Sequence, residues 1–108
     1  MLIRLKYAST LAPTTTTDEI DAIVSHSAVW NHKRGITGVL SVDDRSILQV
    51  LEGPSSKVDG LFDVISEDSR HQGVVLLDRA EIAEPHFAQW GMVRRSLSGM
   101  LLLMATLD

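Results

Sequence analysis

The segment 46–52, with the sequence SILQVLE, is predicted to be a strand that needs cover on both faces. Side chains alternate along a strand, so Ile47, Gln49 and Leu51 share one face while Leu48 and Val50 point to the other. Both sets are aliphatic except for Gln49. An amide buried without partners costs about 1–3 kcal/mol, so the site of Gln49 must supply both a donor and an acceptor.

A buried glutamine can also act as a two-position switch. Turning its terminal amide over, or moving a proton across it, exchanges donor for acceptor with almost no change of shape. We therefore treat Gln49 as the first candidate functional residue.

The hydrophobic pattern along the chain predicts alternating strands and helices. Residues 2–9 alternate as a half-buried strand, and Thr17 with Asp18 opens a helix that runs to about Asn31. A hairpin and a second helix with the inner stripe Val58, Leu61, Phe62 and Ile65 follow, and two more strands end the pattern. The predicted strands after the first helix are 36–42, 46–52, 74–77 and 90–95. This order predicts a ferredoxin-like α+β sandwich, a mixed five-stranded sheet with two helices on one face.

The opposite face of that sheet also needs cover, because Leu48 and Val50 point there. Three candidates could supply it: the C-terminal segment 96–107, a second subunit, or another protein. A short tail covers only part of a sheet, so we favour association, either as a homo-oligomer or with a protein effector.

Composition sets the broad class. The chain of 108 residues is large enough for one core, and its 44% apolar and 22% charged residues are ordinary for a soluble domain. A net charge of −4 argues against a nucleic-acid surface, and the absence of cysteine excludes disulfides and thiolate metal sites. No apolar run is long enough for a membrane span, and no signal peptide is evident, so we expect a cytoplasmic protein.

Several polar groups are predicted to converge on the helix-covered face. Tyr7 ends the first strand and faces inward; strands one and three are neighbours in this topology, which brings Tyr7 within reach of Gln49. Ile23, Ser27 and Asn31 are four residues apart and line one side of the first helix, where they suit a flat ligand with an apolar body and a polar edge. Tyr7 could equally be a core tyrosine, and Asn31 a helix cap.

The remaining candidates are weaker when taken singly. Ile65 on the second helix could oppose Ile23 across a planar ring. Arg70 and His71 could meet a polar ligand group or form a solvated loop, and Trp90 and Met92 could be core residues of the last strand. His26, His32 and His86 lack the spacing and carboxylate neighbours of a metal site.

In combination, these positions resemble the BLUF family of blue-light sensors that use flavin. The matching segments are LKYAS with Tyr7, WNHKRGITGVL with Asn31, ILQVLEGP with Gln49, EDSRH with Asp68 to His71, and FAQWGM with Trp90 and Met92. Their order and spacing over residues 1–95 make the resemblance specific, and residues 96–108 form a short C-terminal tail.

The resemblance implies a photoreceptor rather than an enzyme, with a noncovalent flavin between the two helices. The flavin is usually FAD, with FMN or riboflavin as alternatives. By position, Tyr7 would donate an electron and a proton under blue light, and Gln49 would switch its hydrogen bonds towards flavin O4. The cofactor-binding residues implied are Tyr7, Ile23, Ser27, Asn31, Gln49, Ile65, Asp68, Arg70, His71 and Met92. Trp90 and Met92 would exchange environment on signalling.

The chain departs from the family at two adjacent positions. Val29 replaces a frequent arginine, and Trp30 stands where relatives carry a smaller or more polar residue. Trp30 could pack against the ring edge, compete as an electron donor, or face the surface. The alternative function is a flavin-free interaction module on the same fold. A small acylphosphatase-like hydrolase lacks its phosphate-binding loop here, and an RNA-recognition module lacks its exposed aromatics.

Overall fold

The computed structural model describes residues 1–86 and 92–106, which form one five-stranded sheet between two layers of helix. The elements follow one another as β1 (Leu2–Leu11), α1 (Thr17–Lys33), β2 (Thr37–Asp43), β3 (Ser46–Pro54), α2 (Ser55–Glu67), β4 (His71–Ile82), β5 (Val93–Arg95) and α3 (Leu97–Thr106). The predicted α+β sandwich with a mixed sheet is confirmed.

The sheet has the strand order β4-β1-β3-β2-β5. Strand β1 pairs antiparallel with both β3 and β4, β2 and β3 form the predicted hairpin, and β5 runs parallel to β2. The β1–β3 register sets Tyr7 directly opposite Gln49, as expected for neighbouring first and third strands.

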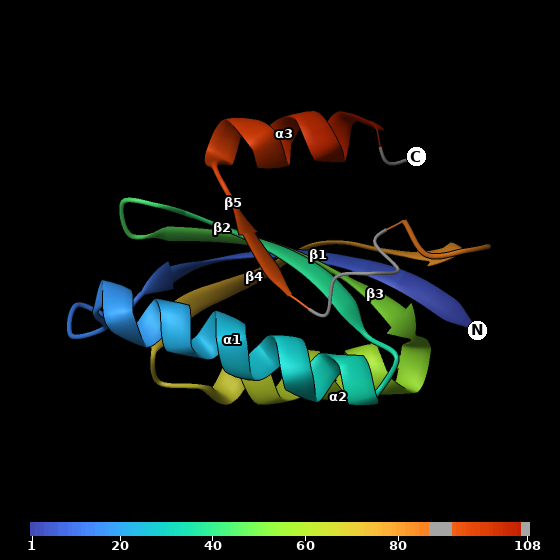
Figure 1. Ribbon diagram of the computed structural model, residues 1–108, viewed down its shortest axis with the longest axis horizontal. Coiled ribbons are helices and arrows are strands. Elements are labelled where there is room, and N and C mark those ends of the chain that lie inside the picture. The colour runs from blue at the N-terminus through green and yellow to red at the C-terminus, as the bar shows by residue number, and fades with distance from the viewer. Residues whose placement is uncertain (87–91, 107–108) are drawn as a thin grey trace.

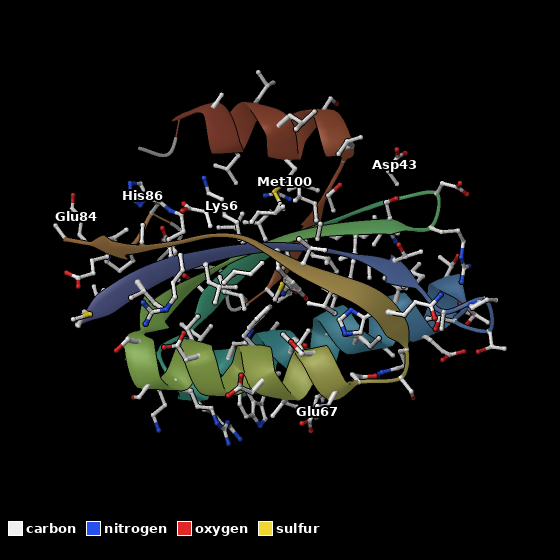
Figure 2. All side chains as sticks on the ribbon, turned by 180° about the vertical axis from the view of Figure 1, so that it is seen from behind. Lys6, Asp43, Glu67, Glu84, His86 and Met100 are labelled. Carbon is white, nitrogen blue, oxygen red and sulfur yellow. The ribbon has the colours of Figure 1, made fainter. Side chains whose placement is uncertain are left out.

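Helices α1 and α2 cover one face of the sheet and α3 lies over the other (Figure 1). On the α1/α2 side, the main core contains Ile3, Leu5, Tyr7 and Leu51, with the predicted stripe of α2 packed against them. On the other side, Met100 of α3 packs on Val39 and Val50 (Figure 2). The two apolar faces of β3 therefore have separate covers.

The start of α1 is fixed by a capping box on Thr16. The Thr16 hydroxyl accepts from the Glu19 amide at 3.2 Å, and the Thr16 amide donates to the Glu19 carboxylate at 3.3 Å. The helix begins at Thr17 as predicted and runs two residues beyond Asn31, to Lys33. Gly35, with φ of 71°, then turns the chain towards β2.

The C-terminal segment is a helix, where the sequence indicated only a short tail. Of the three candidates for covering Leu48 and Val50, the structure places this segment on them through Met100 and Leu103. The sequence argument underestimated it because ten helical residues extend over two strands. Association remains a prediction, since the cover of Val50 does not require it.

The predicted bounds of two strands also need correction. Strand β4 extends from His71 to Ile82 instead of 74–77, because an edge strand with exposed side chains pairs through its backbone and shows little apolar pattern. Strand β5 begins at Val93 instead of residue 90: Met92 precedes the strand, and Trp90 lies outside the described residues. The predicted alternation of β1 is confirmed except at Arg4, which lies on the face assigned to polar residues and is only 3% exposed.

No helix in the described part of the chain combines the length and the apolar character that a bilayer span requires.

Candidate functional site

A cavity of about 320 Å³ lies between α1, α2 and the sheet. This volume is at the lower end of the range for small-molecule sites, and the lining is mainly apolar with a few polar groups, as such sites usually are. The cavity collects every candidate residue for which the structure gives a position: Tyr7, Ile23, Ser27, Asn31, Gln49, Ile65, Asp68, Arg70, His71 and Met92.

A chain of hydrogen bonds from Tyr7 through Gln49 to Met92 forms one wall of the cavity. The Tyr7 hydroxyl donates to Gln49 Oε1, and Gln49 Nε2 donates to the Met92 sulfur at 3.4 Å. All three side chains are buried. Gln49 thus finds the donor and the acceptor that its burial demands, and its amide orientation is defined by unlike neighbours on its two sides.

The position of Met92 depends on a glycine in the neighbouring strand. A Cβ at Gly38 would come within 2.9 Å of the Met92 methyl group and 3.0 Å of a Leu51 methyl. The absence of a side chain at Gly38 therefore lets Met92 approach Gln49.

The charge state of Tyr7 is set by its surroundings. Burial raises the pKa of the Tyr7 phenol well above its ordinary value of 10.0, and the negative charge of Asp68 raises it further. Asp68 is itself held ionised, because hydrogen bonds from Arg70 lower its pKa to about 2. Tyr7 therefore keeps its phenolic proton further into the alkaline range than an ordinary tyrosine does.

Helix α1 presents its predicted column to the cavity. Ile23, Ser27 and Asn31 all line it, and Asn31 is the most deeply buried of the three, with 1% of its surface exposed. The backbone carbonyl of Asn31 accepts from the amides of Arg34 and Ile36, both at 2.9 Å, and this fixes the end of the helix. Asn31 thus combines a capping role for its backbone with a side chain at the cavity.

The connection from α2 to β4 closes one end of the cavity. Asp68 and Arg70 form an ion pair, and His71 is held through both ring nitrogens, with Nδ1 2.9 Å from the Ser9 hydroxyl and Nε2 2.5 Å from the Ile65 carbonyl. The sequence suggested either a ligand contact or a solvated loop for Arg70 and His71. The structure shows His71 partly buried and fixed, while Arg70 is half exposed.

Several lining residues were not identified as site residues from the sequence. His26 lies on the same face of α1 as Ile23, and its spacing of three residues from Ile23 was the available signal. Trp30, for which the sequence left the ring edge open as one of three alternatives, also lines the cavity. Leu40 and Val42 of β2 also line the cavity, and the available signal was their spacing of two residues, which puts them on one face of the strand. The apolar lining includes Leu11, Ile20, Val24, Leu40, Val42, Ile47, Leu61 and Val64.

The side chains that line the cavity fit a flat heteroaromatic ring. Ile23 and Ile65 offer aliphatic surfaces from the two helices, and Asn31 and Gln49 offer amide groups that pair with both donors and acceptors. The described residues contain no group of three or more His, Cys, Asp or Glu side chains that could hold a metal ion.

Comparison with known proteins gives consistent results. A family model described as sensors of blue-light using FAD matches residues 2–93. The chain is 31% identical over 77 residues to the blue light- and temperature-regulated antirepressor BluF of Escherichia coli strain K12. The matched region is 71% of this chain and 19% of that protein. It is 31% identical over 93 residues to the photoactivated adenylate cyclase subunit alpha of Euglena gracilis, covering 84% of this chain and 9% of that protein.

Among solved structures, the dark state of the BLUF protein BlrB superposes with a TM-score of 0.85 at 34% identity, over 96% of this chain and 79% of that one. The chain spans less than a fifth of each curated relative, whereas it spans most of BlrB. Because the family match extends over residues 2–93, this protein belongs to the BLUF family of flavin-binding blue-light sensors.

Proposed function

We propose that FAD binds noncovalently in the cavity between α1 and α2, and that Tyr7 and Gln49 convert light absorption into a new hydrogen-bond arrangement. The observation that carries this proposal is the continuous chain from the Tyr7 hydroxyl through the Gln49 amide to the Met92 sulfur along the cavity wall. Asn31 would hold the polar edge of the ring, and Ile23 and Ile65 would contact its two faces.

When bound, the flavin supplies blue-light absorption and, in its excited state, an acceptor for one electron. Tyr7 is the donor in this proposal. The Tyr7 phenol is protonated in the dark, and its hydroxyl donates to Gln49 Oε1, so Gln49 can accept the proton when Tyr7 gives up an electron. Both return to Tyr7, and the protein undergoes no net chemical change. We therefore assign no enzymatic turnover to this domain.

The change that persists after the electron and proton return is in the hydrogen bonds of Gln49. In the structure its Oε1 accepts from Tyr7 and its Nε2 donates to Met92. Rotation or tautomerisation of the amide reverses these roles: the group next to Tyr7 becomes a donor, and Met92 loses its donor. Met92 begins the segment that leads into β5, so the change at Gln49 reaches the edge of the sheet.

The test is the absorption spectrum of the purified protein in the dark and after blue illumination, with mass spectrometry of the extracted chromophore. We expect a yellow protein, bound FAD and a reversible red shift of the flavin band. Tyr7→Phe should retain the flavin and lose the shift, because the ring stays and the donated proton is gone. Phe62→Leu is the control. The Phe62 ring packs edge-on against Tyr7, with the ring centres 5.5 Å apart, and its replacement leaves the Tyr7 hydroxyl in place.

Two results would contradict this proposal. A colourless protein with the same fold would favour the flavin-free interaction module, and a Tyr7→Phe variant that cycled normally would remove Tyr7 from the mechanism. FMN or riboflavin in the extract would correct the identity of the flavin alone.

We further propose that the signal passes to a protein partner, an effector or a second copy, on the α3 side of the sheet. Leu101 and Leu102 support this, because they are 54% and 72% exposed on a helix that packs on the sheet through Met100. Light scattering of the protein in the dark and under illumination tests the homo-oligomer directly, and a monomer under both conditions would leave only the effector. The cytoplasm remains the predicted location.

A further inference from the structure

Trp30 is an aromatic residue at the cavity wall with a cation fixed on its ring. It lies on α1 next to Asn31 and lines the same cavity as Tyr7 and Gln49. The guanidinium carbon of Arg34 is 3.5 Å from the centre of the Trp30 ring. Arg34 also donates from its terminal nitrogen to the Trp30 carbonyl at 3.1 Å, one helical turn back along the chain. Two contacts thus hold the guanidinium over the indole.

An indole beside a photo-oxidant is a competing electron donor. An electron taken from Trp30 would be unproductive here, because the described hydrogen bonds of Gln49 go to Tyr7 and Met92 and none goes to Trp30. Trp30 would lose one electron to the excited chromophore and regain it on recombination. No bond is made or broken in that exchange, and Gln49 is left as it was.

We propose that Arg34 suppresses electron donation from Trp30 and thereby directs light-driven electron transfer to Tyr7. A cation over an aromatic face is attracted by the electron density of the neutral ring. That attraction becomes repulsion once the ring carries a positive charge, so the guanidinium disfavours oxidised Trp30. This inference rests on the proposed function, since it requires a flavin in the cavity.

The competing explanation is that Arg34 only stabilises the end of α1. Its side chain bonds to the Trp30 carbonyl, and its backbone amide to the Asn31 carbonyl. A structural role and an electronic role both predict a defect when Arg34 is replaced. They differ in whether that defect depends on the indole at residue 30.

The experiment is a double-mutant cycle on the flavin-loaded protein with Arg34→Met, Trp30→Phe and the double variant. Arg34→Met removes the charge and keeps an unbranched side chain. We expect it to lower the quantum yield of the red-shifted state by about twofold to fivefold, the factor that corresponds to a modest cation–π contact. The fluorescence lifetime of the flavin should shorten as well. Neither effect should occur when Arg34→Met is added to Trp30→Phe.

A matched control removes a positive charge elsewhere. Arg79 of β4 pairs with Asp59 at the surface and its side chain is 41% exposed, whereas Trp30 lies on α1. Arg79→Met should leave both the quantum yield and the flavin lifetime at their parental values.

A second readout does not depend on the photocycle. The protein is treated in the dark with the one-electron oxidant hexachloroiridate(IV), and oxidation at Trp30 is measured by peptide mass spectrometry relative to Trp90 in the same molecules. Arg34→Met should raise this ratio, whereas Arg79→Met should not.

The proposal is overturned if Arg34→Met keeps the parental yield, lifetime and oxidation ratio, or if its defect persists in the Trp30→Phe background. Failure of the proposed function is a different result. A parental protein without a red shift, or a Tyr7→Phe variant that cycles normally, refutes the assignment of Tyr7, while the oxidation ratio still reports on Arg34 and Trp30.

Discussion

At the scale of single residues, the site depends on buried polar side chains that satisfy one another's hydrogen bonds. Tyr7 and Gln49 are both at most 5% exposed, and the Tyr7 hydroxyl donates the hydrogen bond that Gln49 Oε1 accepts. The sequence could predict this pair, because the topology makes strands one and three neighbours and the strand period puts both side chains on one face. It could not predict the fixed ring of His71, whose partners Ser9 and Ile65 come from two other elements.

Trp30 illustrates another limit of the sequence at this scale. Packing at a ring edge, competition as a donor and exposure were all compatible with its position in the pattern. The structure places it at the cavity with Arg34 over its ring. The spacing of four residues permits that contact, but many such pairs extend into solvent instead, so the sequence alone does not distinguish the alternatives.

The pKa of Tyr7 provides a prediction in the alkaline range. Tyr7 is the only tyrosine, so a single ring-carbon resonance in a ¹³C-tyrosine-labelled sample reports on it. At pH 11 an unperturbed tyrosine is roughly nine-tenths ionised. Tyr7 in the folded protein should show the shift of the neutral phenol there, while the urea-unfolded chain titrates near its ordinary value of 10.0.

The sign of the linked stability change follows from the same shift. Above pH 10 the unfolded chain releases the Tyr7 proton and the folded chain keeps it, so the free energy of unfolding falls as the pH rises. A folded protein whose tyrosine resonance titrated together with that of the unfolded chain would contradict the burial and the Asp68 effect described here.

At the scale of elements, a buried ion pair joins β1 to β3 on the α3 side of the sheet. Arg4 Nε donates to Glu52 at 3.0 Å, and the two side chains are 4% and 0% exposed. The His86 amide also donates to Glu52, at 2.5 Å, which attaches the segment that follows β4 to the same carboxylate. The alternating pattern of residues 2–9 assigned Arg4 to a polar face, and nothing in that pattern indicated a partner 48 residues away.

Arg4→Met should therefore destabilise the fold strongly. Removing one member of a buried ion pair costs about 3–5 kcal/mol, and we expect the lower end because His86 still bonds to Glu52. Urea unfolding followed by circular dichroism measures this. The control is Arg79→Met, which breaks an exposed pair with Asp59 and should change stability by no more than about 1 kcal/mol. Equal losses in the two variants would contradict the burial of the Arg4–Glu52 pair.

Helix α3 belongs to the fold because one of its side chains completes the second core. Met100 is fully buried against Val39 and Val50, whereas Leu102 on the same helix is 72% exposed. Met100→Ala should lower the free energy of unfolding by about 2–5 kcal/mol through lost burial and the cavity left behind. Leu102→Ala should change it by no more than about 0.5 kcal/mol. Similar values for the two would show that α3 does not pack on the sheet as described.

At the scale of the whole molecule, the two faces of the sheet carry different structures. Helices α1 and α2 lie on one face of the sheet and α3 on the other (Figure 1). The cavity is on the side of α1 and α2, and the Arg4–Glu52 pair is on the side of α3. The sequence predicted the first layer well, since the apolar stripes of both helices and the alternation of β3 all point to it. It predicted the second layer poorly, because α3 is apolar on nearly every side and shows no helical periodicity.

The central claim is that the amide of Gln49 stores the light signal. The most direct test compares light-minus-dark absorption spectra of Gln49→Leu and Gln72→Leu. Gln72 is an exposed glutamine of β4, so it provides the same substitution outside the cavity. We predict that both variants bind flavin, that Gln72→Leu keeps the reversible red shift of the parent, and that Gln49→Leu loses it. A Gln49→Leu protein that shifted and recovered like the parent would contradict the account.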